Sequence, residues 1–331
     1  MAGPLRFRHS TQTWTIERVR SALLRPLDER FGATLSTPWY VPPDGYQARR
    51  IEMDNGDLAL FAWGNGQAYW LGNTETPEAL WRTDKIEIGA APDGLGTWAE
   101  RELAAGVALA EPWLAEYESL LEFFLPVLCS KDGAESTRRF FREEAAGFPD
   151  ASREEGLTFY DDFLKTGALD EFRYEMAAKL GTSEAPDGVR MRATMAEFNA
   201  AKLLIDAGYE VVPEPAVADG HYLDFRVPTA DVLVEVTRPE PPTRRRAGTP
   251  AAAIRETVDG KTGTQLRAAP NALLLVDCTS FRDDEWQAIL DGKPAVGHEP
   301  VVIYRYRPDG QLEGYALGNV PLELGFVTAP A

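Results

Sequence analysis

The chain has 331 residues, of which 44% are hydrophobic, so it is long enough for two globular domains with buried cores. Its formal net charge of -18 argues against a long-range attraction to nucleic acid, because a phosphate backbone is drawn to a positive field. The two cysteines and three histidines lack the spacing of metal ligands, which argues against a zinc site. We expect both thiols to be buried and free, as in a reducing cytosol.

The composition also weakens the argument from net charge. Lysine occurs only seven times, arginine is much commoner, and Asp, Glu and Ala are abundant, a profile that resembles proteins of extreme halophiles. At about 1 M salt the Debye length is roughly 3 Å, so local charge clusters indicate partners better than the net charge does. The N-terminal residues lack the apolar core of a signal peptide, and no stretch approaches the roughly 20 apolar residues of a membrane span. We therefore expect a cytoplasmic protein.

The first half of the chain begins with an amphipathic helix over residues 15–30. Asn55-Gly56 and Asn65-Gly66 then supply the positive φ angles of tight hairpins and predict a three-stranded meander. From Thr97, which can form a capping box with Glu100, the pattern is helical up to residue 128, with a division or kink at Pro112. Further helices are expected over residues 135–146, 157–165 and 168–180.

The stretch GTSEAPDG, residues 181–188, is the best candidate for a linker. It divides the chain into an N-terminal domain, residues 1–181, made of the meander and helices, and a C-terminal domain, residues 190–331. The N-terminal part is rich in aromatic residues, which could stack on bases or could form an ordinary core, and its function stays open. These residues include Trp63, Trp70, Trp81, Trp98 and Trp113.

The C-terminal half predicts a mixed α/β domain. A helix over residues 191–207 is followed by a strand in YEVVPE, two strands that carry acids in YLDFRVPTADVLVEVTR, a helix over residues 250–268 and the apolar strand ALLLVD. A helix over residues 283–290 and a hairpin around Pro308-Asp309-Gly310 complete it. The continuous apolar run over residues 272–276 is typical of a strand covered on both faces. The element order is thus αβββαβ, with a further helix and two strands.

Two acids, Asp224 and Glu235, interrupt these strands. If the hairpin turns symmetrically about Thr229 and Ala230, Asp224 faces Glu235, and the alternate positions form a uniformly apolar face. Directly opposed carboxylates are destabilising unless something neutralises them. A divalent cation would do so, and hard oxygen ligands favour Mg²⁺ or Mn²⁺.

Glu197 is a third acid in the region, beside the apolar stripe of the first helix. From this position it could point along the sheet toward Asp224 and Glu235. The alternative is a solvated side chain on a helix flank.

Residues of roughly 190–280 resemble the restriction-endonuclease-like PD-(D/E)XK nuclease superfamily. The resemblance implies an αβββαβ core in which Glu197, Asp224 and Glu235 bind one or two Mg²⁺ ions. In that superfamily a lysine two residues after the second acid assists the attacking water. Here that position holds Thr237, which supplies no positive charge.

Two explanations for this departure stay open. In some members of the superfamily the lysine lies on the following helix, and Lys261, with Gln265 one turn later, is the obvious substitute. The other explanation is that catalysis has been lost. The choice between them decides whether the domain is an enzyme.

The loop RPEPPTRRRAG contains the densest basic cluster in the chain: Arg238, Arg244, Arg245 and Arg246. Arginine forks suit phosphate oxygens, and contacts at short range survive in salt better than a long-range field does. The loop could therefore bind phosphates, or it could be solvated and flexible.

The sequence therefore suggests a metal-dependent nuclease that hydrolyses phosphodiesters, with nucleic acid, DNA by preference, as its partner and with no membrane association. The catalytic set would be Glu197, Asp224, Glu235, Lys261 and Gln265. The alternative is a catalytically inactive protein of the same fold that binds nucleic acid or serves as a regulatory module. The oligomeric state is left open, a homodimer included.

Overall fold

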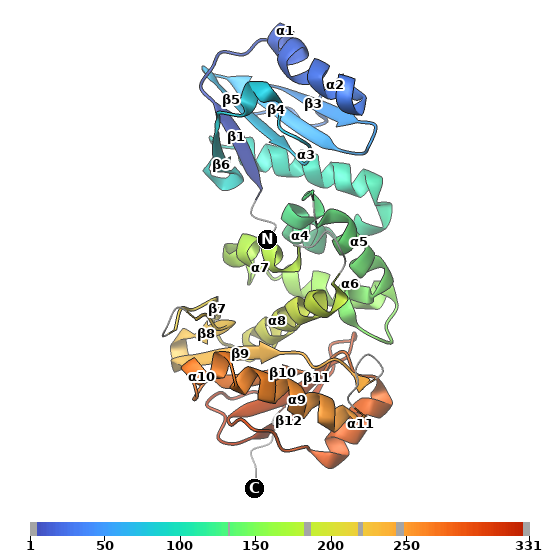
Figure 1. Cartoon of the computed structure of the whole chain (residues 1–331), viewed down its shortest axis with the longest axis vertical. Coiled ribbons are helices and arrows are strands. Elements are labelled where there is room, and N and C mark those ends of the chain that lie inside the picture. The colour runs from blue at the N-terminus through green and yellow to red at the C-terminus, as the bar shows by residue number, and fades with distance from the viewer. Residues whose placement is uncertain (1–4, 132, 182–186, 218–220, 243–247, 327–331) are drawn as a thin grey trace. The chain divides into compact units, whose positions relative to one another are not determined.

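The computed structural model describes residues 5–131, 133–181, 187–217, 221–242 and 248–326, and Figure 1 shows their helices and strands. Contacts divide the chain into two compact units, Met1–Glu135 and Ser136–Ala331. The described residues form two six-stranded sheets, together with helices. The predicted mixture of helix and strand is therefore confirmed.

The division between the units differs from the predicted domain boundary. Helices that follow residue 136, which we expected in the N-terminal domain, pack with the C-terminal elements. Tyr160 donates a hydrogen bond to Asn199 over 3.0 Å, and Arg192 contacts Glu144 at 2.6 Å. Residues 182–186 of the predicted linker lie outside the described part of the chain.

The first unit contains an antiparallel sheet with the strand order β2-β3-β4-β5-β1-β6. The predicted meander is β3–β5, and Asn65 with Gly66 adopts positive φ angles of 51° and 74° in its second turn. Short strands that the sequence did not reveal extend the sheet on both sides. The strands are β1 (Arg6–Ser10), β2 (Ala33–Ser36), β3 (Gln47–Met53), β4 (Leu58–Gly64), β5 (Gln67–Gly72) and β6 (Asp84–Glu87).

Helices cover this sheet. One run, made of α1 (Ile16–Arg18), the π-helical η1 (Val19–Leu24) and α2 (Arg25–Phe31), packs apolar side chains such as Leu23 against Phe61 and Trp70. A second helix, α3 (Leu95–Ala110), places buried Glu102 at 2.8 Å from Arg50 of β3. This helix begins at Leu95 after Gly94, which has a φ of 76°, so the predicted capping box of Thr97 and Glu100 is wrong.

Pro112 lies in a 3₁₀ turn (Pro112–Leu114) between α3 and α4 (Glu118–Leu128), as predicted from its missing N–H. Helix α5 (Ala134–Glu143) begins two residues before the boundary between the units and lies mostly in the second. The second unit also contains α6 (Arg153–Leu164), α7 (Arg173–Leu180) and α8 (Gly188–Asp206) before its sheet. Within the described residues, no helix combines the length and apolar character that crossing a bilayer requires.

The sheet of the second unit has the strand order β12-β11-β10-β9-β8-β7. Its central strands β9, β10 and β11 are parallel, and every residue of β10 is buried, as the apolar run predicted. The strands are β7 (Val212–Pro213), β8 (Phe225–Val227), β9 (Val232–Thr237), β10 (Leu273–Asp277), β11 (Val301–Tyr306) and β12 (Leu312–Leu317).

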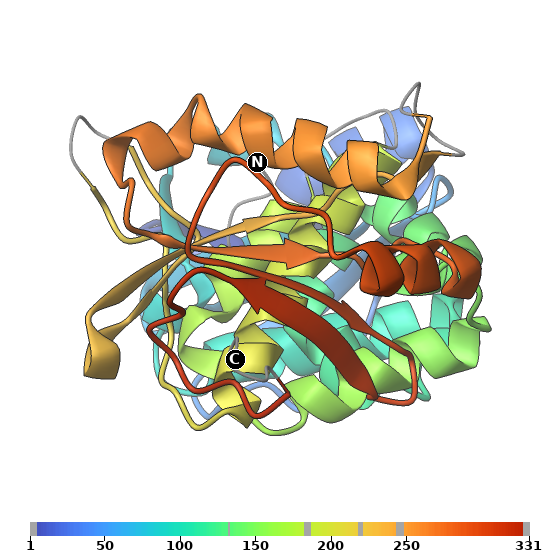
Figure 2. The same ribbon diagram turned by 90° about the horizontal axis from the view of Figure 1, so that it is seen from below.

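Two layers of helices enclose this sheet, and Figure 2 shows α8 and α9 on opposite faces. Side chains of α9 (Pro250–Thr262) and α11 (Asp283–Gly292) form one core with β10 and β11, including Ile254, Trp286, Leu274 and Ile303. Helix α8 packs against β9 and β10. The predicted order of α, three strands, α, strand, α and two strands is observed, with the predicted helix 250–268 broken into α9 and α10 (Gln265–Ala268).

Candidate functional site

The register of β8 on β9 brings the two strand acids together. The observed pairs, Phe225 with Val234 and Val227 with Val232, are those predicted from the hydrophobic pattern. Asp224 directly precedes β8 and, in the same register, faces Glu235 of β9. Its Oδ2 atom accepts a hydrogen bond of 2.7 Å from the backbone N–H of Val236.

Lys261 of α9 contacts Glu235, one of these two acids. Its Nζ atom lies 2.6 Å from Oε1 of Glu235, whose side chain is only 2% exposed. The lysine on the following helix therefore reaches the acids, as we expected of a substitute for Thr237. Thr237 itself is buried in β9, on the same side of the strand as Glu235.

Glu197 of α8 belongs to the same cluster and is not a solvated residue on a helix flank. Its Oε2 atom lies 2.6 Å from Nζ of Lys179 in α7, and both side chains are less than one-fifth exposed. Lys179 also contacts Glu214 at 3.1 Å. We refer to Glu197, Asp224, Glu235, Lys179 and Lys261 as the acid–lysine cluster.

Burial and mutual repulsion perturb the acids of this cluster. Burial, followed by the charge of Asp224, raises the pKa of Glu197 to about 8. The same two causes raise the pKa of Glu235 to about 7. Burial also raises the pKa of Asp224, against the opposing effect of Lys261. Although burial acts to lower it, the charges of Glu235 and Asp224 hold the pKa of Lys261 above its usual value.

The carboxylates of the acid–lysine cluster are suitable ligands for a hard cation. Two of them, however, already contact lysine side chains. Carboxylate oxygens are the ligands that Mg²⁺ and Mn²⁺ prefer. Yet the part of the chain that the structure describes contains no group of three or more His, Cys, Asp or Glu side chains placed to hold a metal ion. Instead, Glu197 and Glu235 each lie 2.6 Å from a lysine nitrogen.

Gln265 does not share a helix face with Lys261. Helix α9 ends at Thr262, and Gln265 begins the separate α10, where its side chain contacts the hydroxyl of Thr264. Because the break interrupts the helical spacing, the predicted pairing of the two residues one turn apart is wrong.

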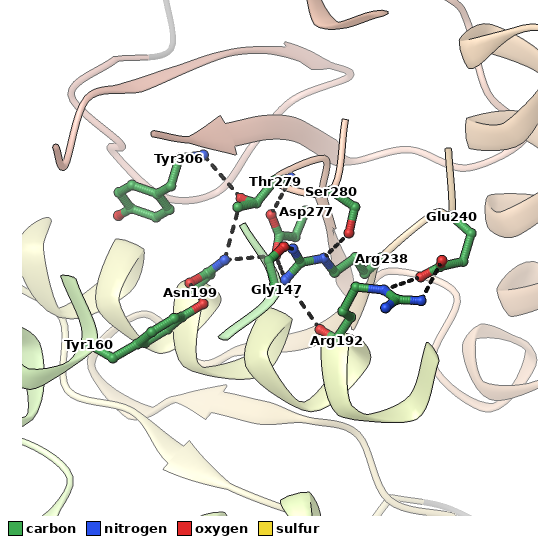
Figure 3. A network of polar contacts seen from close by, with 10 residues as sticks. All are labelled: Gly147, Tyr160, Arg192, Asn199, Arg238, Glu240, Asp277, Thr279, Ser280 and Tyr306. Atoms are coloured by element: carbon green, nitrogen blue, oxygen red, sulfur yellow. Dashed lines mark hydrogen bonds and ion pairs between the residues drawn. The ribbon is translucent and has the colours of Figure 1, made fainter. Parts of the chain in front are cut away.

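Arg238 is a buried structural residue, which corrects its assignment to a phosphate-binding loop. Its side chain is 1% exposed and lies 3.4 Å from the buried carboxylate of Asp277. It also donates to Ser280 and to the carbonyl of Gly147, as Figure 3 shows. A phosphate cannot reach a guanidinium enclosed in this way. The other three arginines, Arg244, Arg245 and Arg246, lie outside the described residues.

The network around Arg238 fills the carboxyl ends of β9 and β10, where open α/β sheets commonly bind ligands. Asn199 of α8 donates to Asp277 over 2.9 Å, and Arg192 forms two hydrogen bonds to Glu240 (Figure 3). The acid–lysine cluster draws on other residues of α8 and β9, Glu197 and Glu235. The network around Arg238 and the acid–lysine cluster therefore share no residue. Of these two groups, only the cluster combines carboxylates with lysines.

Comparison with known proteins identifies the family of the chain. A family model described as a family of unknown function (DUF5784) matches residues 2–324. The chain belongs to DUF5784. Neither curated proteins nor solved structures gave a match. Because the match spans both units, the DUF5784 family is defined by the first unit as well as by the acid-bearing sheet.

Lys179 and Glu214 are the residues of this DUF5784 site that sequence reasoning missed. Lys179 is one of only seven lysines in the chain, and this rarity is a signal that could have drawn attention to it. Glu214 ends the strand motif YEVVPE, next to the acid-bearing strands. Their contacts depend on the packing of α7 against α8, which no local pattern reveals.

Arg238→Gln should lower the stability of the DUF5784 protein. The substitution leaves Asp277 buried without its cation, and breaking a buried ion pair costs about 3–5 kcal/mol. Urea unfolding followed by circular dichroism measures this loss, with the surface variant Arg226→Gln as control, because Arg226 pairs with exposed Asp231. Unchanged stability together with weaker nucleic-acid binding would restore Arg238 to the phosphate-binding loop.

Asp224→Asn should stabilise the protein in the absence of divalent ions. Asp224 is the leading charge that raises the pKa of both Glu197 and Glu235, and removing it relieves a repulsion of about 1 kcal/mol. Groups with a raised folded pKa destabilise the fold as pH rises, so the gain should be larger at pH 8 than at pH 5. Thermal melts with EDTA test this, and a variant less stable than wild type at pH 8 would contradict it.

Proposed function

We propose that this DUF5784 protein is a metal-dependent nuclease whose second unit has the restriction-endonuclease-like PD-(D/E)XK fold. One observation carries the proposal: Lys261, from the helix after the acid-bearing strands, lies 2.6 Å from Glu235. A lysine so placed restores the positive charge that Thr237 cannot supply. The order α8, β7–β9, α9 and β10 and the grouping of Glu197 with Asp224 and Glu235 add support.

The residues of the acid–lysine cluster take distinct roles in this proposal. Glu197, Asp224 and Glu235 would hold Mg²⁺ or Mn²⁺. Such an ion, when bound, polarises a phosphodiester and makes a bound water more acidic. Because its pKa lies above the usual value, Lys261 is an ammonium ion at neutral pH, so it acts by stabilising negative charge rather than as a general base.

The substrate would be nucleic acid, with DNA the first to test. Arg244, Arg245 and Arg246 follow β9 in sequence and supply guanidinium groups for the phosphates. Arg238 has no part in this contact, because it is held by Asp277 and Ser280.

A second function, a binding or regulatory module without catalysis, is favoured by one observation. Lys179 and Lys261 already lie against Glu197 and Glu235, so the carboxylates have counter-charges without a metal ion. Opposed acids therefore do not by themselves require a cation. Thr237 in place of the motif lysine points the same way. The two functions differ in whether a metal-dependent cleavage exists.

Mg²⁺ or Mn²⁺ should raise the melting temperature of the wild-type protein, because a ligand that binds only the folded state stabilises it by mass action. Asp224→Asn should abolish this gain and the cleavage of nucleic acid, whereas Asp231→Asn, an exposed acid on the same hairpin, should retain both. Thermal melts and cleavage of labelled single- and double-stranded DNA and RNA in molar salt measure this. Metal binding without cleavage of any substrate would favour the binding module.

Lys261→Met should slow cleavage about 100- to 1,000-fold, as expected when one charge that stabilises the transition state is removed. The metal-induced rise in melting temperature should persist, since no ammonium group then competes for Glu235. Lys202→Met is the matched control. Lys202 lies on α8, where it pairs with Asp206 of the same helix, and it is not part of the acid–lysine cluster. Single-turnover cleavage at saturating Mg²⁺ provides the rate, and a wild-type rate for Lys261→Met would remove Lys261 from the mechanism.

A further inference from the structure

The first unit contains a cavity with a basic wall. It has a volume of about 460 Å³ and lies where β1 begins, β5 ends and α4 terminates. Four cations line it: Arg6, Arg8, Lys85 and Lys131. None of the described residues in its wall is acidic. Such a wall is unusual in a chain with a formal net charge of -18.

A second cavity, of about 480 Å³, lies in the second unit at the carboxyl ends of β10 and β11. Arg305 and several acids line that other cavity together, so its charge favours no single class of ligand. The cavity of the first unit has one sign of charge and is the more informative.

The strand register places like charges against one another in this basic pocket. Arg8 of β1 lies directly opposite Lys85 of β6, so both side chains project from the same face of the sheet. Like charges at such a position are destabilising unless an opposite charge offsets them. Among the described residues, no carboxylate forms an ion pair with Arg8, Lys85 or Lys131, whereas Arg6 has Glu87 at 3.6 Å.

A buried hydroxyl in the same wall also lacks a partner. Oγ1 of Thr74 is inaccessible to solvent and makes no hydrogen bond with the described residues. Nearby, Thr76 accepts a hydrogen bond of 3.0 Å from Nε of Arg8, which orients the guanidinium group.

We propose that this pocket binds a small phosphorylated molecule, with its phosphoryl oxygens on Arg8, Lys85 and Lys131. A cavity of 460 Å³ lies in the range of small-molecule sites, about 300–1,000 Å³. Several cations around one cavity match a ligand that carries two or more negative charges on one group, and an arginine fork fits phosphate oxygens. The cations line one cavity of an acidic chain, which favours a small anion over a nucleic-acid strand.

Calorimetric titration with sodium pyrophosphate, ADP and adenosine tests the proposal. EDTA keeps divalent ions away, so the result is independent of the acid–lysine cluster. Pyrophosphate or ADP should bind, and adenosine should not. ADP binding without pyrophosphate binding identifies a nucleotide, and binding of both identifies the phosphoryl groups as the recognised part. The double variant Arg8→Gln with Lys85→Gln should weaken binding by about 10- to 100-fold.

Two further variants test whether binding occurs in this pocket. Arg20→Gln removes an exposed cation of the same unit outside the pocket and should leave binding unchanged. Lys131→Gln removes an exposed lysine of the pocket wall and should weaken binding even if the double variant does not fold. The proposal is overturned if neither pyrophosphate nor ADP binds, if Lys131→Gln and Arg20→Gln have equal effects, or if only an oligonucleotide binds.

Discussion

The register of β8 on β9 is the constraint on which the candidate site depends. Side chains alternate between the faces of a strand, so a slip of one residue would exchange the two faces. Phe225 and Val234 pair on the apolar face and are completely buried. Burial of that face therefore fixes the opposite one, and Asp224 meets Glu235 as a consequence. The free energy gained by burying the apolar face offsets the repulsion between the two carboxylates.

Lysines then determine how these carboxylates are tolerated. The sequence predicts that a divalent cation neutralises the opposed acids. In the structure, Lys261 contacts Glu235 and Lys179 contacts Glu197, each at 2.6 Å. Compensation is incomplete, because burial and Asp224 still raise the pKa of Glu197 to about 8. The lysines thus offset part of the negative charge of the cluster, and the excess that remains is one that a cation could neutralise.

Local patterns predicted much of the fold and the core of the site. Alternation gave the register of the hairpin and Asn-Gly turns gave the meander, whereas Lys261 was expected from the superfamily resemblance. Residues whose positions depend on packing distant in sequence were not predictable. Lys179 reaches Glu197 through the contact of α7 with α8, and the short edge strand β6 has no hydrophobic alternation strong enough to identify it. The superfamily resemblance stays a prediction.

Arg238 shows why a dense basic sequence is a weak guide to a binding surface. It precedes three other arginines in the chain, but its ion pair with Asp277, distant in sequence, buries it in the core. Arg8 and Lys85 lie far apart in the sequence, yet the strand register places them together without a paired carboxylate among the described residues. A cation with a buried carboxylate partner holds the fold, and one without such a partner remains available to a ligand.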